Sequence, residues 1–133
     1  MSGDFFDTNV VLYLLDEGAK ADAAERRLAA GGVISVQVIN EALVNCRRKA
    51  LLSWEEADAF LFGIRQLCRV VDLTPEIHDV GRALAERHRL SVYDAMIVGA
   101  ALVSGCTRLF SEDMQAGLLV EDTLRIVDPF AGI

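Results

Sequence analysis

Short apolar runs alternate along the chain with longer stretches in which apolar residues recur every three or four positions. The longer stretches are typical of amphipathic helices, and in one of them Ile77, Val80 and Leu84 form a single apolar stripe. The short runs predict five β-strands, at Asp4–Asp7, Val33–Ser35, Arg69–Leu73, Thr107–Phe110 and Leu124–Val127. Strands that alternate with helices favour an α/β fold with a mainly parallel central sheet flanked by helices, in three layers (α/β/α).

Several helix starts are marked by residues that commonly cap a helix. The marked starts are Ser53 with Glu56 three positions later, Thr74 followed by Pro75, and Ser91 with Asp94 three positions later. A further helix is expected at Val10–Leu15. The apolar run Ala95–Val103 is about half of the ~20 residues that a membrane span needs, so it predicts a core helix.

The length of 133 residues fits a single domain over positions 1–133, because two separate cores would each be marginal in size. The first twenty residues have no basic start, and Asp4 and Asp7 lie where a secretory signal would be apolar, so we expect a cytoplasmic protein. Three cysteines, Cys46, Cys68 and Cys106, lie in apolar patterns of helical type without metal-binding spacing. They are expected to be buried free thiols.

Composition and charge limit the classes of function that this protein can have. A net charge of −7 excludes simple electrostatic adhesion to nucleic acid or to an anionic membrane, since that needs a basic footprint. If nucleic acid is the substrate, a divalent cation is the obvious source of positive charge. The hydrophobic fraction of 53% and the mean hydropathy of +0.32 indicate that another chain covers part of the surface, as in a homodimer or a complex with a protein partner.

Four carboxylates follow strands or begin helices, where the ligands of an open parallel sheet bind. These are Asp7 in "FFDTN", Glu41 in "VISVQVINEAL", Asp94 in "SVYDAMIVGAA" and Asp113 in "LFSED". Each has a structural alternative. Asp7 could cap the following helix, Asp94 could complete a capping box with Ser91, Glu41 could pair with Arg48, and Asp113 could be solvated.

Taken together, the four carboxylates suggest a metal site. Clustered carboxylates resist ionisation unless a cation lies between them, and an all-oxygen site suits Mg²⁺ or Mn²⁺. Such an ion neutralises phosphate charge and activates a bound water, which is the chemistry of phosphodiester hydrolysis.

The four motifs, in this order and across nearly the whole chain, resemble the PIN-domain ribonucleases, and most closely the VapC-type toxins of toxin-antitoxin pairs. The resemblance implies a small α/β/α fold, metal-dependent endoribonuclease activity on RNA and inhibition by a cognate antitoxin. By position it implies that Asp7, Glu41, Asp94 and Asp113 are the acidic quartet, with Asn9 and Ser111 as supports. Ala116 departs from the pattern, since many relatives carry a polar residue, often histidine, before the equivalent of Gly117.

Two rival functions are weighed against a nuclease. An aspartyl-phosphate phosphotransfer domain also places an aspartate after an apolar strand, but it needs a lysine beside the phosphoryl group. The only lysines, Lys20 and Lys49, are expected in helical segments away from strand ends. The second rival is a non-catalytic PIN-like interaction module, which the presence of all four carboxylates disfavours.

Three consecutive basic residues, Arg47, Arg48 and Lys49, end the helix that carries Glu41. They predict either a phosphate-guiding patch for RNA or surface charge matched to the helix dipole. The two histidines, His78 and His88, lack a second ligand at metal-binding spacing.

Overall fold

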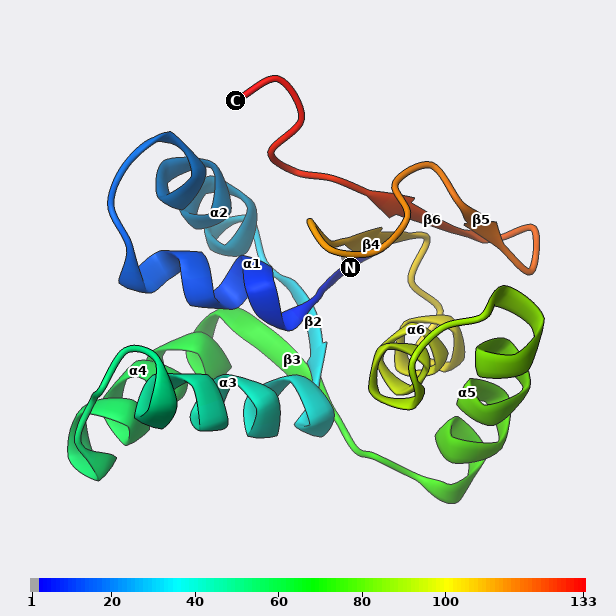
Figure 1. Cartoon of the computed structure of the whole chain (residues 1–133), viewed down its shortest axis with the longest axis horizontal. Coiled ribbons are helices and arrows are strands. Elements are labelled where there is room, and N and C mark those ends of the chain that lie inside the picture. The colour runs from blue at the N-terminus through cyan, green and yellow to red at the C-terminus, as the bar shows by residue number, and fades with distance from the viewer. Residues whose placement is uncertain (1–2) are drawn as a thin grey trace.

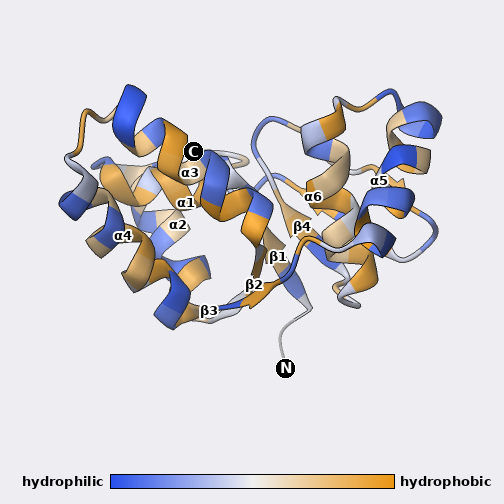
Figure 2. Ribbon diagram, turned by 90° about the horizontal axis from the view of Figure 1, so that it is seen from below, coloured by the Kyte–Doolittle hydropathy of each residue, from blue (hydrophilic) through white to orange (hydrophobic). Residues whose placement is uncertain are grey.

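The computed structural model describes residues 3–133, which form a six-stranded sheet with helices on both faces (Figures 1 and 2). The strands are β1 (Asp4–Phe6), β2 (Gly32–Ser35), β3 (Cys68–Val71), β4 (Arg108–Phe110), β5 (Leu119–Val120) and β6 (Leu124–Val127). Their order in the sheet is β3-β2-β1-β4-β6-β5, and all neighbours are parallel except β5 and β6. The predicted α/β fold with a mainly parallel sheet is confirmed.

All five predicted strands are present, as β1, β2, β3, β4 and β6, with ends displaced by at most two residues. The largest difference is at β3, which ends two residues before Leu73. Leu73 is 45% exposed, because the chain has left the sheet and runs toward the next helix. The short antiparallel strand β5 was not predicted, since two residues are too few to show an alternating pattern.

The helices are α1 (Thr8–Leu12), the 3-10 helix η1 (Tyr13–Leu15), α2 (Ala19–Ala29), α3 (Val36–Arg48), α4 (Trp54–Leu67), α5 (Pro75–His88) and α6 (Val92–Val103). Ser53, Thr74 and Ser91 cap α4, α5 and α6 as predicted. The helix expected at Val10–Leu15 begins two residues earlier and ends as η1. No helix in residues 3–133 is long and apolar enough to cross a membrane.

The helices form two layers. Figure 2 shows α1 to α4 on one side of the sheet and α5 with α6 on the other. The α5–α6 pair packs closely because glycines meet at its contact: a Cβ on Gly99 would lie 3.1 Å from the Gly81 nitrogen. Helix α6 is buried from Ala95 to Ala101, so the apolar run predicted to be a core helix is one.

The core holds the central strands in register. Phe5, Phe6 and Phe110 are fully buried, and the rings of Phe6 and Phe110 stack at 5.8 Å between centroids. Each buried phenylalanine contributes about 1.5–3 kcal/mol of hydrophobic stabilisation. The parallel pairing of β1 with β4 therefore brings the residues that follow these strands, Asp7 and Ser111, to the same edge of the sheet.

The three cysteines are buried, as predicted, and burial raises the pKa of each thiol, that of Cys68 to about 11. Their expected placement in helices is wrong for two of them. Cys68 opens β3, which follows α4 without a loop, and Cys106 lies in the turn after α6. A buried apolar strand start and a helix end show the same local hydrophobicity, so the pattern alone did not separate them.

Candidate functional site

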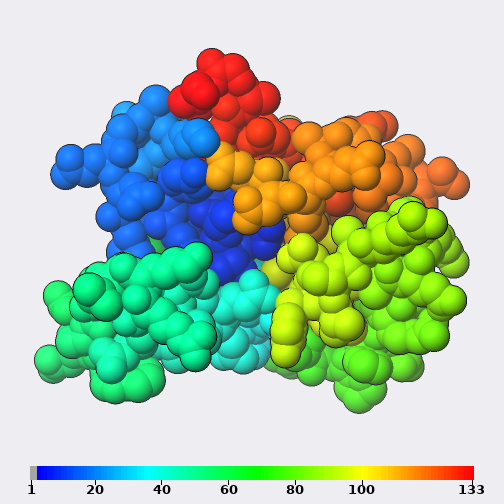
Figure 3. Space-filling model, in the orientation of Figure 1, coloured from blue at the N-terminus to red at the C-terminus, as the bar shows by residue number. Residues whose placement is uncertain are grey.

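The candidate site lies at the carboxyl edge of the sheet, where β1, β2 and β4 end. Helix α3 begins directly after β2, so Glu41 lies in its second turn, and α6 brings Asp94 in its first turn. On the face shown in Figure 3, the cyan start of α3 lies beside the yellow-green start of α6, below the blue end of β1 and the orange loop after β4. Four separate elements thus supply the four carboxylates.

Asp7 is the buried centre of the site, with 4% of its surface exposed. It caps α1, and its Oδ1 accepts a 2.7 Å hydrogen bond from the Thr8 backbone N–H. Its Oδ2 accepts from Ser111 Oγ at 2.7 Å and from Asn9 Nδ2 at 3.0 Å. The capping role that sequence offered as an alternative is therefore real, and it coexists with a carboxylate fixed at the site.

The pKa of Asp7 is raised from 3.8 to about 6. Burial is the largest cause, because it disfavours the charged form. The hydrogen bonds from Ser111 and Thr8 act in the opposite direction, and the charges of Asp94 and Glu41 raise the pKa further. Asp7 therefore lies within electrostatic reach of two of the other predicted carboxylates.

Glu41 is held by neutral donors. Thr8 Oγ1 donates to its Oε1 at 3.0 Å, and Gln37 Nε2 donates to its Oε2 at 2.6 Å. No ion pair joins Glu41 to Arg48 among residues 3–133, so the structural pair considered from the sequence is not formed. The Thr8 contact ties α3 to the turn that carries Asp7.

Asp113 lies in the exposed loop after β4 and reaches the site through Asn9. Asn9 Nδ2 donates to Asp113 Oδ2 at 3.1 Å as well as to Asp7, and Asn9 Oδ1 accepts from the Glu112 backbone N–H at 3.2 Å. One amide therefore fixes the loop and links two carboxylates from different elements. The alternative considered from the sequence, that Asp113 contacts solvent alone, is therefore wrong, because its carboxylate accepts a hydrogen bond from Asn9.

Asp94 starts α6 beside Ser91, whose Oγ accepts the Asp94 backbone N–H at 3.2 Å. The pKa of Asp94 is raised, first by burial and then by the charges of Glu41 and Asp113, against a hydrogen bond with Ser91. Helix capping and membership of the acidic cluster therefore coexist at Asp94.

The four carboxylates do not form a ready-made metal site in the arrangement that their side chains have here. Within residues 3–133, no three histidine, cysteine, aspartate or glutamate side chains form a group that could hold an ion without rearrangement. The four carboxylates instead take part in hydrogen bonds with amide, hydroxyl or backbone donors. The donor set is nonetheless all oxygen. Burial is the main cause of the raised pKa of Asp7 and Asp94, and a cation among the carboxylates would offset the repulsion that adds to it. In donor chemistry and charge, the residues fit Mg²⁺ or Mn²⁺.

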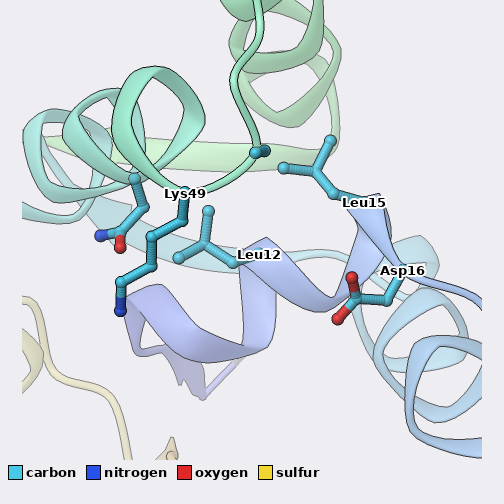
Figure 4. A pocket seen from close by; sticks show the side chains of 6 residues that line it. Leu12, Leu15, Asp16 and Lys49 are labelled. Carbon is cyan, nitrogen blue, oxygen red and sulfur yellow. The ribbon is translucent and has the colours of Figure 1, made fainter.

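The three basic residues at the end of α3 differ in their surroundings. Arg47 donates to the Leu52 carbonyl at 2.7 Å and lies over the Trp54 ring at 4.3 Å. Arg48 is exposed. Lys49 lines a pocket of about 240 Å³ between α3 and the α1–η1 segment, together with Leu12 (Figure 4). Among residues 3–133, Arg48 is the one of the three that has no hydrogen bond, no ring contact and no place in this pocket.

Several contacts at the site involve residues that sequence reasoning did not single out. Tyr13 Oη and Lys20 Nζ donate to the two oxygens of Glu112, at 2.7 and 2.5 Å, and so anchor the loop that carries Asp113. The expectation that both lysines lie away from strand ends is therefore wrong for Lys20. Its ammonium is paired with Glu112 rather than placed beside Asp7, so it does not supply the lysine that a phosphoryl-aspartate site needs. The hydrogen bond between Gln37 and Glu41 was also missed, although their i, i+4 spacing on one helix is a signal that could have indicated it.

Comparison with known proteins gives one family and a consistent fold. The model of the PIN domain family matches residues 5–116. A toxin-antitoxin complex from Klebsiella pneumoniae is 18% identical, with 96% of this chain and 98% of that chain covered and a TM-score of 0.74. VapC20 of Mycobacterium tuberculosis, a sarcin-ricin loop cleaving toxin, is 21% identical over 83% of this chain and 89% of its own, with a TM-score of 0.68.

DNA-bound VapBC from Salmonella typhimurium is 20% identical over 97% and 99% of the two chains, with a TM-score of 0.73. At these identities the likeness shows a shared fold. The comparison with curated protein sequences gave no match.

Proposed function

Because the chain belongs to the PIN domain family, we propose that it is a metal-dependent endoribonuclease and the toxin of a toxin-antitoxin pair. One observation carries the proposal: carboxylates from four separate elements meet at one sheet edge, and the pKa of the most buried one is raised to about 6. Solved structures of the same fold include toxin-antitoxin complexes and a toxin that cleaves the sarcin-ricin loop, which supports the assignment.

The residues divide into ligands and supports. Asp7, Glu41, Asp94 and Asp113 would hold Mg²⁺ or Mn²⁺, which when bound neutralises the charge of an RNA phosphate and lowers the pKa of a water molecule. Burial and a backbone N–H from Thr8 fix the orientation of Asp7.

The supports act on three of the ligands. Ser111 hydrogen-bonds Asp7, Gln37 and Thr8 hydrogen-bond Glu41, and Asn9 joins Asp7 to Asp113. These neutral donors hold carboxylates that would otherwise repel one another. Neutral donors of the chain therefore orient these carboxylates, which must still rearrange to hold an ion.

We further propose that the protein is cytoplasmic, forms a homodimer and is inhibited by an antitoxin. Large apolar side chains lie on its surface: Leu51 is 79% exposed and Trp54 is 61% exposed. An antitoxin segment that covers apolar surface and places a basic side chain among the carboxylates would bind by both hydrophobic burial and charge. Charge reversal at Asp94 should then weaken antitoxin binding.

The nuclease assignment is tested with purified protein and a mixed RNA substrate. Cleavage should require Mg²⁺ or Mn²⁺, stop in chelator and return when the ion is restored. Asp7→Asn should abolish it, while Asp58→Asn, which changes an exposed carboxylate on α4, should not. Antitoxin binding by a folded wild type that never cleaves RNA would instead favour a non-catalytic interaction module.

A further inference from the structure

A groove runs beside Glu41, between α3 and the start of α6. It measures about 450 Å³ and is lined by Gln37, Asn40, Glu41, Val44 and Tyr93. A second hollow of about 400 Å³ shares Gln37 and Tyr93 and continues toward the start of α5. Tyr93 therefore lines both hollows, one of which is also lined by a carboxylate of the site.

Tyr93 is unusual for a large aromatic side chain because 68% of it is exposed, immediately before Asp94 in the chain. Among the described residues 3–133, no hydrogen bond or ring contact involves the Tyr93 side chain. The neighbouring Val92 and Val44 are also exposed, by 59% and 47%. The fold thus leaves an aromatic face open to solvent next to the acidic cluster without a structural reason.

We propose that Tyr93 is a base-stacking residue, and that the groove beside Glu41 takes an unpaired base of the RNA next to the phosphodiester that is cleaved. The inference rests on the proposed nuclease function and names the part of the substrate that this surface recognises. When a phosphate of an RNA strand lies at the carboxylates, an adjacent base of that RNA lies to one side of them. On the side of Asp94, the ring of Tyr93 offers a flat apolar surface. Stacking on an aromatic side chain is a main source of affinity for single-stranded nucleic acid.

The chemistry of the lining suits a neutral base better than a phosphate. Within the described residues 3–133, no lysine or arginine lines the groove, whereas two side-chain amides do. Gln37 donates its amide N–H to Glu41, which leaves its amide oxygen as an acceptor, and the exposed Asn40 offers both a donor and an acceptor. These groups match the polar edge of a base, while Tyr93 and Val44 match its face.

Charge also favours a base over other occupants. The protein carries a net charge of −7, so a phosphate backbone is repelled by most of its surface. Stacking adds affinity without added cations, and it selects unpaired RNA, since the bases of a duplex are already stacked on one another.

The experiment measures binding of two fluorescein-labelled 12-mers, one of random RNA sequence and one with abasic riboses throughout, so that the phosphate charge is equal. Asp113→Asn serves as the background that prevents cleavage, with Mg²⁺ present and at fixed ionic strength. In this background the protein should bind the base-bearing RNA more tightly than the abasic one. Adding Tyr93→Ala should reduce that preference about tenfold or more, and Tyr93→Phe should retain it.

Phe62→Ala is the matched control, because Phe62 is an aromatic residue of similar exposure, 62%, on α4. It should leave the preference unchanged. In the otherwise wild-type enzyme, Tyr93→Ala should raise KM for RNA more than it lowers kcat, and it should change the bases found beside the cleavage sites.

The outcomes separate this inference from the proposed function. If Tyr93→Ala and its Asp113→Asn parent prefer base-bearing RNA over abasic RNA equally, and the wild type cleaves RNA, the stacking role is overturned. The proposed nuclease function would still stand. Loss of a dimer by Tyr93→Ala in light scattering, with the base preference unchanged, would overturn it in favour of an interface between copies. A folded wild type that neither binds nor cleaves RNA would overturn the proposed function and this inference together.

Discussion

The side-chain amide of Asn9 lies 3.1 Å from Asp113 Oδ2, and this bond joins residues that are 104 positions apart in the chain. The same nitrogen lies 3.0 Å from Asp7 Oδ2. A single neutral donor thus bridges a buried carboxylate on a short turn and an exposed one on a loop. This amide, together with the contacts of Tyr13 and Lys20 with Glu112, holds the loop after β4 at the site.

Replacing Asn9 by alanine should therefore affect the site more than the fold. We expect Asn9→Ala to lower the free energy of unfolding by about 1–2 kcal/mol, since it removes part-buried hydrogen bonds. Cleavage should fall more than tenfold, because Asp113 is released from Asp7. The measurement combines urea denaturation with initial cleavage rates at saturating Mg²⁺.

Asn45→Ala is the matched control for that prediction. Its amide donates to the Glu41 backbone carbonyl at 2.9 Å and, among residues 3–133, to no carboxylate, so the variant tests the loss of an amide outside the acidic cluster. The control should keep near wild-type cleavage. Full cleavage by Asn9→Ala would show that the bridge does not position Asp113.

Metal binding should stabilise the protein by relieving repulsion among the carboxylates. If Mg²⁺ binds with a Kd on the order of 1 mM, about 10 mM free ion should add roughly 1.4 kcal/mol, and the melting temperature should rise by several degrees. In chelator, Asp94→Asn should melt no lower than wild type, because the substitution keeps the backbone hydrogen bond to Ser91 and removes one like charge. Added metal should then help the variant less.

Differential scanning calorimetry at fixed protein concentration measures both proteins with chelator and with metal. An equal shift in the two, or no shift in either, would mean that Asp94 only begins α6 and is not a ligand.

The raised pKa of Asp7 predicts a pH dependence of stability in the absence of metal. The pKa of Asp7 is about 6 in the folded state and 3.8 without the fold, so the folded state binds this proton more tightly. The resulting stabilisation is fully present below about pH 4 and is lost as the pH rises through 6. Between pH 5 and pH 7, wild type should lose about 1 kcal/mol that Asp7→Asn does not lose.

Urea denaturation of both proteins in chelator at several pH values isolates this difference. With 10 mM Mg²⁺ the difference should shrink, because a bound cation favours the ionised carboxylate. A wild type and an Asp7→Asn variant with parallel pH profiles in chelator would contradict the raised pKa.

Alanine substitutions at Arg47 and Arg48 should have different effects, the first on the stability of the fold and the second on the binding of RNA. Arg47→Ala loses a hydrogen bond to Leu52 and a cation–π contact with Trp54, so it should destabilise the fold by about 1–2 kcal/mol. Arg48→Ala should leave stability unchanged. If Arg48 guides phosphate, its removal should lower kcat/KM and reduce the salt dependence of cleavage.

Arg65→Ala removes an exposed arginine from α4 and serves as the charge control. Equal kcat/KM and salt dependence for Arg48→Ala and Arg65→Ala would assign Arg48 to general surface charge.

The sequence was enough to predict that the carboxylates lie together at one edge of the sheet. It was not enough to predict which side chains hold them there. Asp7 directly follows a strand and Asp94 begins a helix, so their place at one sheet edge depends only on local pattern and parallel pairing. The bond between Thr8 and Glu41, 33 positions apart, depends on how α3 packs against α1, which no local pattern encodes. The anchor of Glu112 on Tyr13 and Lys20 was missed for the same reason.

The basic residues show a further limit. Arg47, Arg48 and Lys49 are consecutive and suggested one patch, yet Arg47 packs on Trp54 while Lys49 lines a separate pocket. Consecutive helical residues point about 100° apart, so adjacency in the chain does not place side chains together.

The central claim is that the carboxylate cluster cleaves RNA, and global mapping of RNA 5′ ends after expression of wild type and Asp94→Asn tests it most directly. Wild type should produce new 5′ ends that recur in one sequence or structural context. These ends should be absent with Asp94→Asn at equal protein level. The same new ends in both samples, or none in either with both proteins folded and free of antitoxin, would contradict the account.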